Sequence, residues 1–211
     1  MYDNGESEPT SGVVGIGPVT FTDPTTDCFT AGTMIETERG EVAIEDLQVG
    51  DMVRTMDHGM QPLRWVNSSK VKAKGRRAPV LIKKGALGND RDLLVSQAHR
   101  VLLQDWRNEF LFDEGEVLVA ANSLVNDQTI MRQEGGMVEY FHILFDRHEI
   151  VFANGMPAES FHPGEASVGQ MAKQSRAEIY DLFPELEGNE ASYGYSVRKT
   201  IYAAEASLLA G

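Results

Sequence analysis

The chain has 211 residues, enough for one domain with terminal extensions and a buried core. Its net charge of −13 argues against non-specific binding to nucleic acid or to an anionic membrane, since both require positive charge. One cysteine excludes an internal disulfide and a zinc site of several thiolates. No apolar run approaches the roughly 20 residues of a membrane helix. A classical signal peptide is also absent, which leaves a cytoplasmic protein or secretion by a non-classical route.

Residues 1–27 form the first compositional unit. They contain five acids and no Lys or Arg, and they are rich in Gly, Pro, Ser and Thr. This composition predicts a flexible acidic leader, with Val13–Phe21 as a candidate edge strand.

Residues 28–162 read as short β-branched runs separated by turns. The expected strands are Glu41–Ile44, Asp51–Met56, Leu63–Val66, Val80–Lys83, Asp92–Val95, Val101–Gln104, Glu116–Ala120 and Val138–Phe145. Turn signals such as Arg39-Gly40, Asp57-His58-Gly59 and Asn126-Asp127 fall between them. Many short strands with regular turns predict a mostly-β domain.

The pattern changes again after Pro163-Gly164. Met171–Leu182 and Ser196–Ala210 show apolar residues at helical spacing. Residues 163–211 are therefore predicted to form a helical C-terminal extension that packs on the β-domain or on a partner subunit.

The only cysteine opens an ordered block of sequence. Cys28 begins the run Cys-Phe-Thr-Ala-Gly-Thr, and Ile44-Glu-Asp-Leu-Gln-Val-Gly-Asp-Met-Val53 follows the next turn. This block resembles the start of hedgehog/intein-type (Hint) domains, and most closely bacterial members of that family. The resemblance covers about Cys28 to Ser160, and it implies a horseshoe-like β fold.

Two later regions continue the resemblance. Ser96 and His99 match a family pattern in which a hydroxyl residue precedes a histidine by three positions. The third region runs from Val138 to Gly155 and holds His142, Asp146 and His148. Either histidine can be the counterpart of the family's late-block histidine. His142 and Asp146 lie four apart on one expected strand and would then share its face.

The resemblance implies a chemistry for these residues. Cys28 is the nucleophile that attacks the preceding Asp27–Cys28 peptide bond, so that the acyl group moves from nitrogen to sulfur. His99 would protonate the leaving nitrogen, and Ser96 would bind the peptide. His148 or His142, with Asp146 nearby, would assist proton movement at the thiol. No cofactor or metal is expected.

The end of the resemblance limits the outcome. Splicing inteins end in His-Asn, and the positions that correspond in this chain hold Glu159 and Ser160. Serine has no amide with which to cyclise, so splicing is not expected. The leader would be the substrate, and water or an external nucleophile would release it. The alternative is a Hint-fold scaffold or interaction module, with an unidentified protein partner, that does not process itself.

Overall fold

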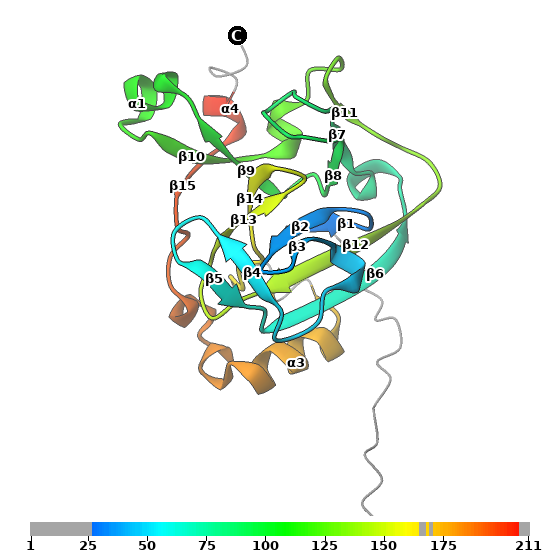
Figure 1. Ribbon diagram of the computed structural model, residues 1–211, viewed down its shortest axis with the longest axis vertical. Helices are drawn as coiled ribbons and strands as arrows, with labels where there is room; N and C mark the ends of the chain where they lie inside the picture. Colours follow the sequence, from blue (N-terminus) through cyan, green and yellow to red (C-terminus); the bar gives the residue numbers. More distant parts are fainter. Residues whose placement is uncertain (1–26, 165–167, 169–170, 207–211) are drawn as a thin grey trace, which may run out of the picture.

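The computed structural model describes residues 27–164, 168 and 171–206, which fold into two β-sheets with short helices around them (Figure 1). The mostly-β prediction is confirmed, and each of the eight predicted strands overlaps an observed one. Val13–Phe21 lies outside the described residues. Within the described part, none of the helices is long and apolar enough to cross a bilayer.

The first sheet has six strands in the order β11-β7-β8-β1-β12-β6. Its longest pair, β6 and β12, is antiparallel along its whole length. The strands are β1 (Phe29–Thr30), β6 (Trp65–Lys72), β7 (Val80–Ile82), β8 (Leu93–Val95), β11 (Ile130–Arg132) and β12 (Met137–Leu144). Short β1 lies between β8 and β12, so both sides of its backbone are paired.

The second sheet has nine strands in the order β15-β10-β9-β14-β13-β2-β4-β5, with β3 paired to β2. All of these pairs are antiparallel except β10 with β15. The strands are β2 (Met34–Thr37), β3 (Gly40–Ala43), β4 (Met52–Thr55), β5 (Gly59–Pro62), β9 (Arg100–Gln104), β10 (Glu116–Ala120), β13 (Ile150–Ala153), β14 (Met156–Glu159) and β15 (Lys199–Ile201).

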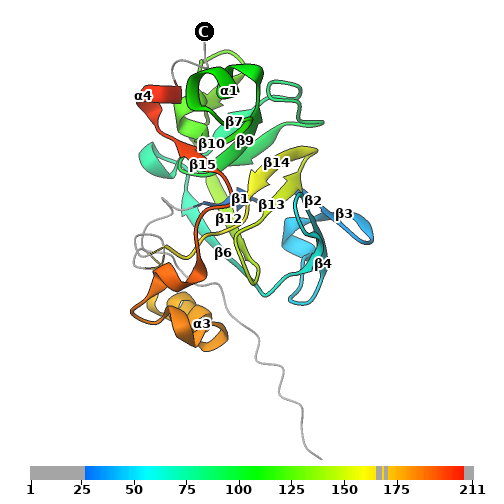
Figure 2. The same ribbon diagram turned by 90° about the vertical axis from the view of Figure 1, so that its left-hand side faces the viewer.

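The α-helices lie toward the two ends of the molecule (Figure 2). The α-helices are α1 (Trp106–Phe112), α3 (Lys173–Leu182) and α4 (Ala203–Ala206). The 3-10 helices are η1 (Ile44–Asp46), η2 (Gly75–Arg77), η3 (Ala121–Leu124), η4 (Pro184–Leu186) and η5 (Glu190–Tyr193). Helix α3 buries Ile179 in a cluster with Trp65 and Phe161, so it covers one face of the first sheet.

The structure confirms one predicted helix of the C-terminal extension and corrects the other. Helix α3 falls within Met171–Leu182. Within the predicted helix Ser196–Ala210, Ala203–Ala206 is helical as α4, and residues 207–210 lie outside the described residues. The prediction is wrong in its first part, because Lys199–Ile201 forms β15, which pairs in parallel with β10. Ile201 is buried there. Apolar residues that recur every three or four positions fit a helix. The edge of β10 that does not pair with β9 was, however, open to a further strand.

The hairpin between β13 and β14 turns at Asn154-Gly155, where both residues have positive φ. The Asn154 side chain accepts a hydrogen bond from the backbone N–H of Met34 and donates one to the carbonyl of Asp92, each at 2.8 Å. The turn therefore ties the late strands to β2 and to the start of β8.

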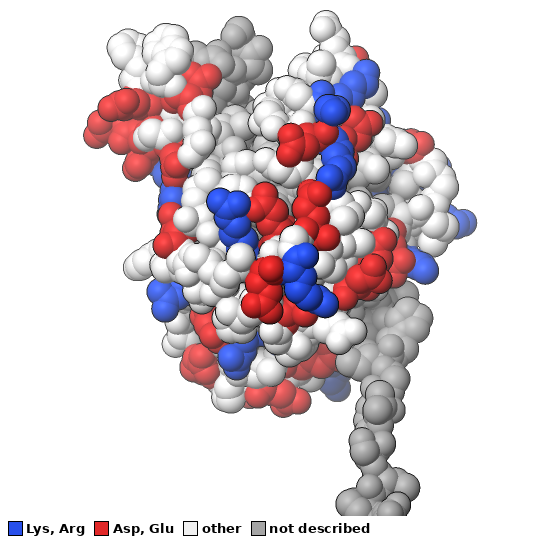
Figure 3. All heavy atoms as spheres, in the orientation of Figure 1, with Lys and Arg blue, Asp and Glu red and all other residues white. Residues whose placement is uncertain are grey.

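On the face drawn in Figure 3, acidic side chains lie among Lys and Arg. Arg39 pairs with Asp51, Arg54 with Glu36 and Arg91 with Glu41. The basic side chains on this face thus have acidic neighbours and do not form a broad positive surface of the kind that binds nucleic acid.

Candidate functional site

Strand pairing places Cys28 between two of the predicted site residues. Phe29 lies opposite Phe141 on β12 and opposite Val95 on β8. Both pairs are antiparallel, so a step back along the chain sets Cys28 opposite His142 on one side and Ser96 on the other. Directly opposed residues of an antiparallel pair have side chains on the same face. Two positions that are 114 and 68 residues from Cys28 therefore meet at it.

The contacts at Cys28 agree with this register. The thiol Sγ lies 2.8 Å from Nε2 of His142. The backbone N–H of Cys28, which belongs to the Asp27–Cys28 peptide bond, donates to Ser96 Oγ at 3.1 Å. In return, the backbone N–H of Ser96 donates to the carbonyl of Cys28 at 2.9 Å. All three residues are buried, so the thiol and the peptide nitrogen are each held by a specific neighbour away from water.

His142 is a neutral imidazole at neutral pH. Its side chain is fully buried, and that burial lowers its pKa to about 3. The ring packs edge-on against Phe161, with ring centroids 5.2 Å apart. A neutral ring at hydrogen-bonding distance from a thiol can accept the proton of that thiol.

His99 lies beside the carbonyl end of the same peptide bond. It follows Ser96 in a tight turn, in which the N–H of His99 donates to the Ser96 carbonyl. Burial lowers its pKa to about 3, and the nearby backbone carbonyl of Asp27 opposes that shift. Neither ring nitrogen meets the strict geometry of a hydrogen bond within the described part of the chain, and the Asp27 carbonyl is the polar group that the buried ring faces there.

A second cluster surrounds the side chain of Asp27. Arg100 on β9 and Glu159 on β14 form a buried ion pair, in which the Nε of Arg100 donates to Glu159 Oε1 at 2.7 Å. The carboxyl of Asp27 faces that of Glu159. Burial, and then the charge of Glu159, raises the pKa of Asp27 well above its usual value. The residue that precedes Cys28 is therefore held through its own side chain.

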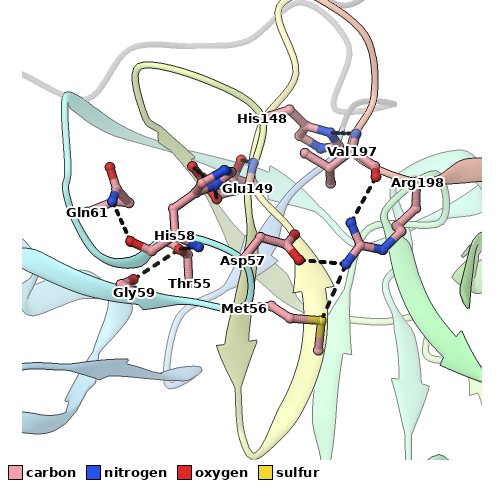
Figure 4. Close-up of polar contacts among 11 residues, drawn as sticks. Thr55, Met56, Asp57, His58, Gly59, Gln61, His148, Glu149, Val197 and Arg198 are labelled. Carbon is pink, nitrogen blue, oxygen red and sulfur yellow. Dashed lines mark hydrogen bonds and ion pairs between the residues drawn. The ribbon is translucent and has the colours of Figure 1, made fainter.

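His148 belongs to this second cluster. Its Nε2 lies 3.1 Å from Oε2 of Glu159, and its Nδ1 accepts the backbone N–H of Val197 at 3.2 Å (Figure 4). Since Nδ1 is an acceptor, the neutral ring carries its proton on Nε2. Burial lowers the pKa of His148 to about 4. The described polar contacts of His148 are therefore with Val197 of the C-terminal extension and with Glu159.

A sequence model described as the Hint domain matches residues 27–165. The chain belongs to the Hint domain family. A search of curated proteins finds no match.

Several solved structures are similar to this Hint domain at low sequence identity. A bacterial intein-like domain from Clostridium thermocellum is 16% identical, with a TM-score of 0.45 over 64% of this chain and 98% of its own. A DnaB intein from Synechocystis sp. PCC 6803 is 14% identical, with a TM-score of 0.43 over 63% of this chain and 97% of its own. The gp41-1 intein is 16% identical, with a TM-score of 0.38 over 62% and 96%.

The Hint domain thus brings together most of the residues predicted from sequence. Ser96 and His142 contact Cys28, and His99 lies at the preceding carbonyl. Asp146 does not join them, because β12 ends at Leu144 and the half-exposed carboxylate of Asp146 pairs with Arg64 at 3.5 Å. The expected shared strand face of His142 and Asp146 is therefore wrong.

Sequence reasoning missed the role of two residues in the Hint domain. Arg100 was not singled out, and Glu159 was considered only as a departure from the family's His-Asn ending. A signal was present, because an acid stands where splicing relatives carry a base, and a buried acid needs a cationic partner. The β9–β14 pairing, in which Ala158 lies opposite Val101, sets Glu159 opposite Arg100.

A surface cleft of about 590 Å³ lies elsewhere on the Hint domain. Residues of β9, α1 and the β7–β8 connection line it, among them Leu87, Leu103 and Asn108. Neither Cys28 nor His142 contributes to its lining, and Cys28 has no exposed surface. The cysteine is therefore in contact with its own chain and is not presented to an outside substrate.

Proposed function

We propose that this Hint domain processes itself by an N→S acyl shift at the Asp27–Cys28 bond and so releases its N-terminal leader. The observation that carries this proposal is the contact pattern of Cys28. Its thiol faces the neutral His142, and the nitrogen of the bond that would break is held by Ser96.

The first step is attack by sulfur. His142 Nε2 accepts the thiol proton, and Sγ adds to the carbonyl carbon of Asp27. A tetrahedral oxyanion forms, and donors at that position stabilise such a species by several kcal/mol in acyl-transfer enzymes, at about 2.7–4 kcal/mol for one donor. His99 lies beside the Asp27 carbonyl and can supply an N–H there.

The second step is collapse of the tetrahedral species. The C–N bond breaks when the proton that left the thiol passes from His142 to the Cys28 nitrogen, which returns His142 to its neutral form, and the acyl group remains on sulfur as a thioester. Ser96 Oγ, which accepts the N–H of that nitrogen, holds it in place during this step. Water or an external nucleophile then attacks the thioester, and the Cys28 thiol is regenerated.

The end of the domain supports cleavage without splicing. Ser160 is buried, and its Oγ accepts the backbone N–H of Glu149 at 3.0 Å. A serine hydroxyl cannot form the succinimide that an asparagine amide forms. We therefore expect the C-terminal side of the domain to stay attached to it.

The test is the intact mass of the full chain over time at neutral pH, with and without a small thiol. We expect separation into residues 1–27 and 28–211, faster with the thiol. The same chain with Cys28→Ala is the control and should stay whole. An intact wild-type chain in both conditions would contradict self-processing and favour the scaffold alternative.

A further inference from the structure

The acyl shift alone does not explain the ion pair formed by Arg100 and Glu159, because this pair does not contact the thiol. Its members are fixed by several bonds. The backbone N–H of Arg100 also donates to Glu159 Oε1, at 2.9 Å, and an Nη of Arg100 donates to the hydroxyl of Thr200 on β15. Glu159 is fully buried. A charged pair held this firmly inside the protein is suited to bind a third polar group.

The third group is the carboxyl of Asp27. Burial raises the pKa of Glu159 although Arg100 opposes that shift, and Asp27 is raised as well. Two neighbouring carboxyls beside one guanidinium, one of them fully buried, are balanced in charge when they share a single proton. In that state one carboxyl donates to the other, and the one positive charge of Arg100 faces one negative charge.

The other titratable groups around the pair do not change this balance. His99 precedes Arg100, and His148 faces Glu159 from the β12–β13 loop. His162 packs on His148, and burial lowers its pKa to about 4. These three imidazoles are neutral at neutral pH. The phenol of Tyr202 also faces Arg100. Arg100 is therefore the one cation among the described groups that face Asp27.

The Arg100–Glu159 pair helps to position the Asp27–Cys28 peptide bond. Ser96 holds the nitrogen side of the Asp27–Cys28 bond, and the Arg100–Glu159 pair holds the side chain on its carbonyl side. Holding both sides keeps the carbonyl carbon in reach of the thiol, and misplacement by about 1 Å can cost about 100-fold in rate.

We infer that Arg100 and Glu159 form a subsite for the side chain of residue 27, which selects a short side chain able to share a hydrogen with Glu159. This inference rests on the proposed function and names the specificity of the same site. Aspartic acid binds with one shared proton. Asparagine binds through its amide, whereas alanine leaves the pair without its third member.

The test measures release of the leader from the full chain at a fixed, saturating concentration of hydroxylamine, so that thioester hydrolysis does not limit the rate. Asp27→Ala should slow release on the order of 10- to 100-fold, from the loss of a hydrogen bond to a charged group. Asp27→Asn and Glu159→Gln should each slow it less, since one amide then faces one carboxylate. Asp127→Asn, an exposed acid in a turn, is the matched control and should not change the rate.

Two readouts separate a subsite from general damage to the fold. The double variant Asp27→Asn/Glu159→Gln leaves Arg100 without a carboxylate, so it should be slower than the product of the single effects. The ratio of the wild-type rate to the Asp27→Asn rate should fall as the pH rises, because only the two carboxyls of Asp27 and Glu159 need a shared proton. An Asp27→Ala chain that releases its leader at the wild-type rate, or a double variant that is merely multiplicative, would overturn the inference.

A wild-type chain that does not cleave would contradict the proposed function and leave the subsite to be tested directly. In the full chain with Cys28→Ala, the carboxyl carbon of Glu159 can be followed by NMR as pH changes. Asp27→Asn should shift that titration to lower pH, because the like charge next to Glu159 is removed. A titration of Glu159 that ignores Asp27→Asn would overturn the subsite.

Discussion

At the scale of residues, the proposed acyl shift depends on which histidine takes the proton of the Cys28 thiol. His142 and His148 were equal candidates for the base, because both lie near the end of one predicted strand. The strand stops at Leu144, so His148 lies in the following loop and reaches Glu159, whereas His142 remains on β12 opposite Cys28. The assignment depends on where the strand ends, which hydrophobic alternation predicts poorly.

The first prediction concerns this base. His142→Gln keeps a polar side chain of similar size but cannot take the thiol proton. We expect leader release to slow by about 10²- to 10⁴-fold, the range for loss of a general base. Release in hydroxylamine, followed by mass, measures the effect.

The control for His142→Gln is His58→Gln. His58 pairs with the buried Glu149, 2.9 Å away, and has no described contact with Cys28, so its replacement by another donor should leave the rate unchanged. If His58→Gln slowed leader release as much as His142→Gln, the effect of His142→Gln would come from lost stability and not from the loss of a base.

At the scale of elements, β15 joins the C-terminal extension to the second sheet and carries a stability prediction. Ile201 on β15 is 1% exposed and packs in the main core. Ile201→Ala should lower the free energy of unfolding by about 2–5 kcal/mol, the usual cost of a large-to-small change in a core. Denaturant unfolding of the Cys28→Ala chain measures it without interference from cleavage.

Tyr202 is the neighbouring control, since its side chain is 72% exposed. Tyr202→Ala should change the free energy of unfolding by no more than about 0.5 kcal/mol. If Ile201→Ala cost as little, the pairing of β15 with β10 would not contribute to the fold.

The elements also show what sequence patterns can and cannot predict. The strands from Glu41 to Phe145 were predicted well, because β-branched runs between turn residues reflect local preferences. Helix α1 was not predicted, and its Trp106 and Phe110 are exposed at 76% and 83%, so no buried stripe marks it. The cluster of Asp27, Arg100 and Glu159 joins three separate segments, and only the sheet registers bring them together.

At the scale of the whole molecule, three buried histidines determine how stability responds to acid. Burial lowers the pKa values of His99, His142 and His148 to about 3, 3 and 4. The unfolded chain binds these protons near pH 6.5, so the stability that the neutral rings contribute is present above pH 6.5 and is lost as the pH falls. Each ring adds a slope of at most about 1.4 kcal/mol per pH unit.

Asp27 and Glu159 act in the opposite sense. Their folded pKa values are raised, so they stabilise the fold at low pH and lose that contribution as the pH rises. Below about pH 4 both acids are protonated in either state, and the histidine slope ends between about pH 4 and 3, where the folded rings also take up their protons. The free energy of unfolding of the Cys28→Ala chain should therefore fall as the pH drops from 6.5 toward 3, because three depressed histidines outweigh two raised acids.

Denaturant titrations at a series of pH values measure this profile. Adding His142→Gln should reduce the slope by about one proton, because one depressed histidine is gone. A slope between pH 6.5 and 4 that His142→Gln leaves unchanged would contradict a neutral buried imidazole at this position.

The most direct test of the acyl shift to Cys28 is the mass of the leader that the full chain releases in hydroxylamine. A thioester between Asp27 and Cys28 predicts residues 1–27 ending in a hydroxamate on the Asp27 carbonyl, together with residues 28–211 bearing a free Cys28 thiol. The Cys28→Ala chain should release nothing. A leader that ends elsewhere, or the same hydroxamate from the Cys28→Ala chain, would contradict an acyl shift to Cys28.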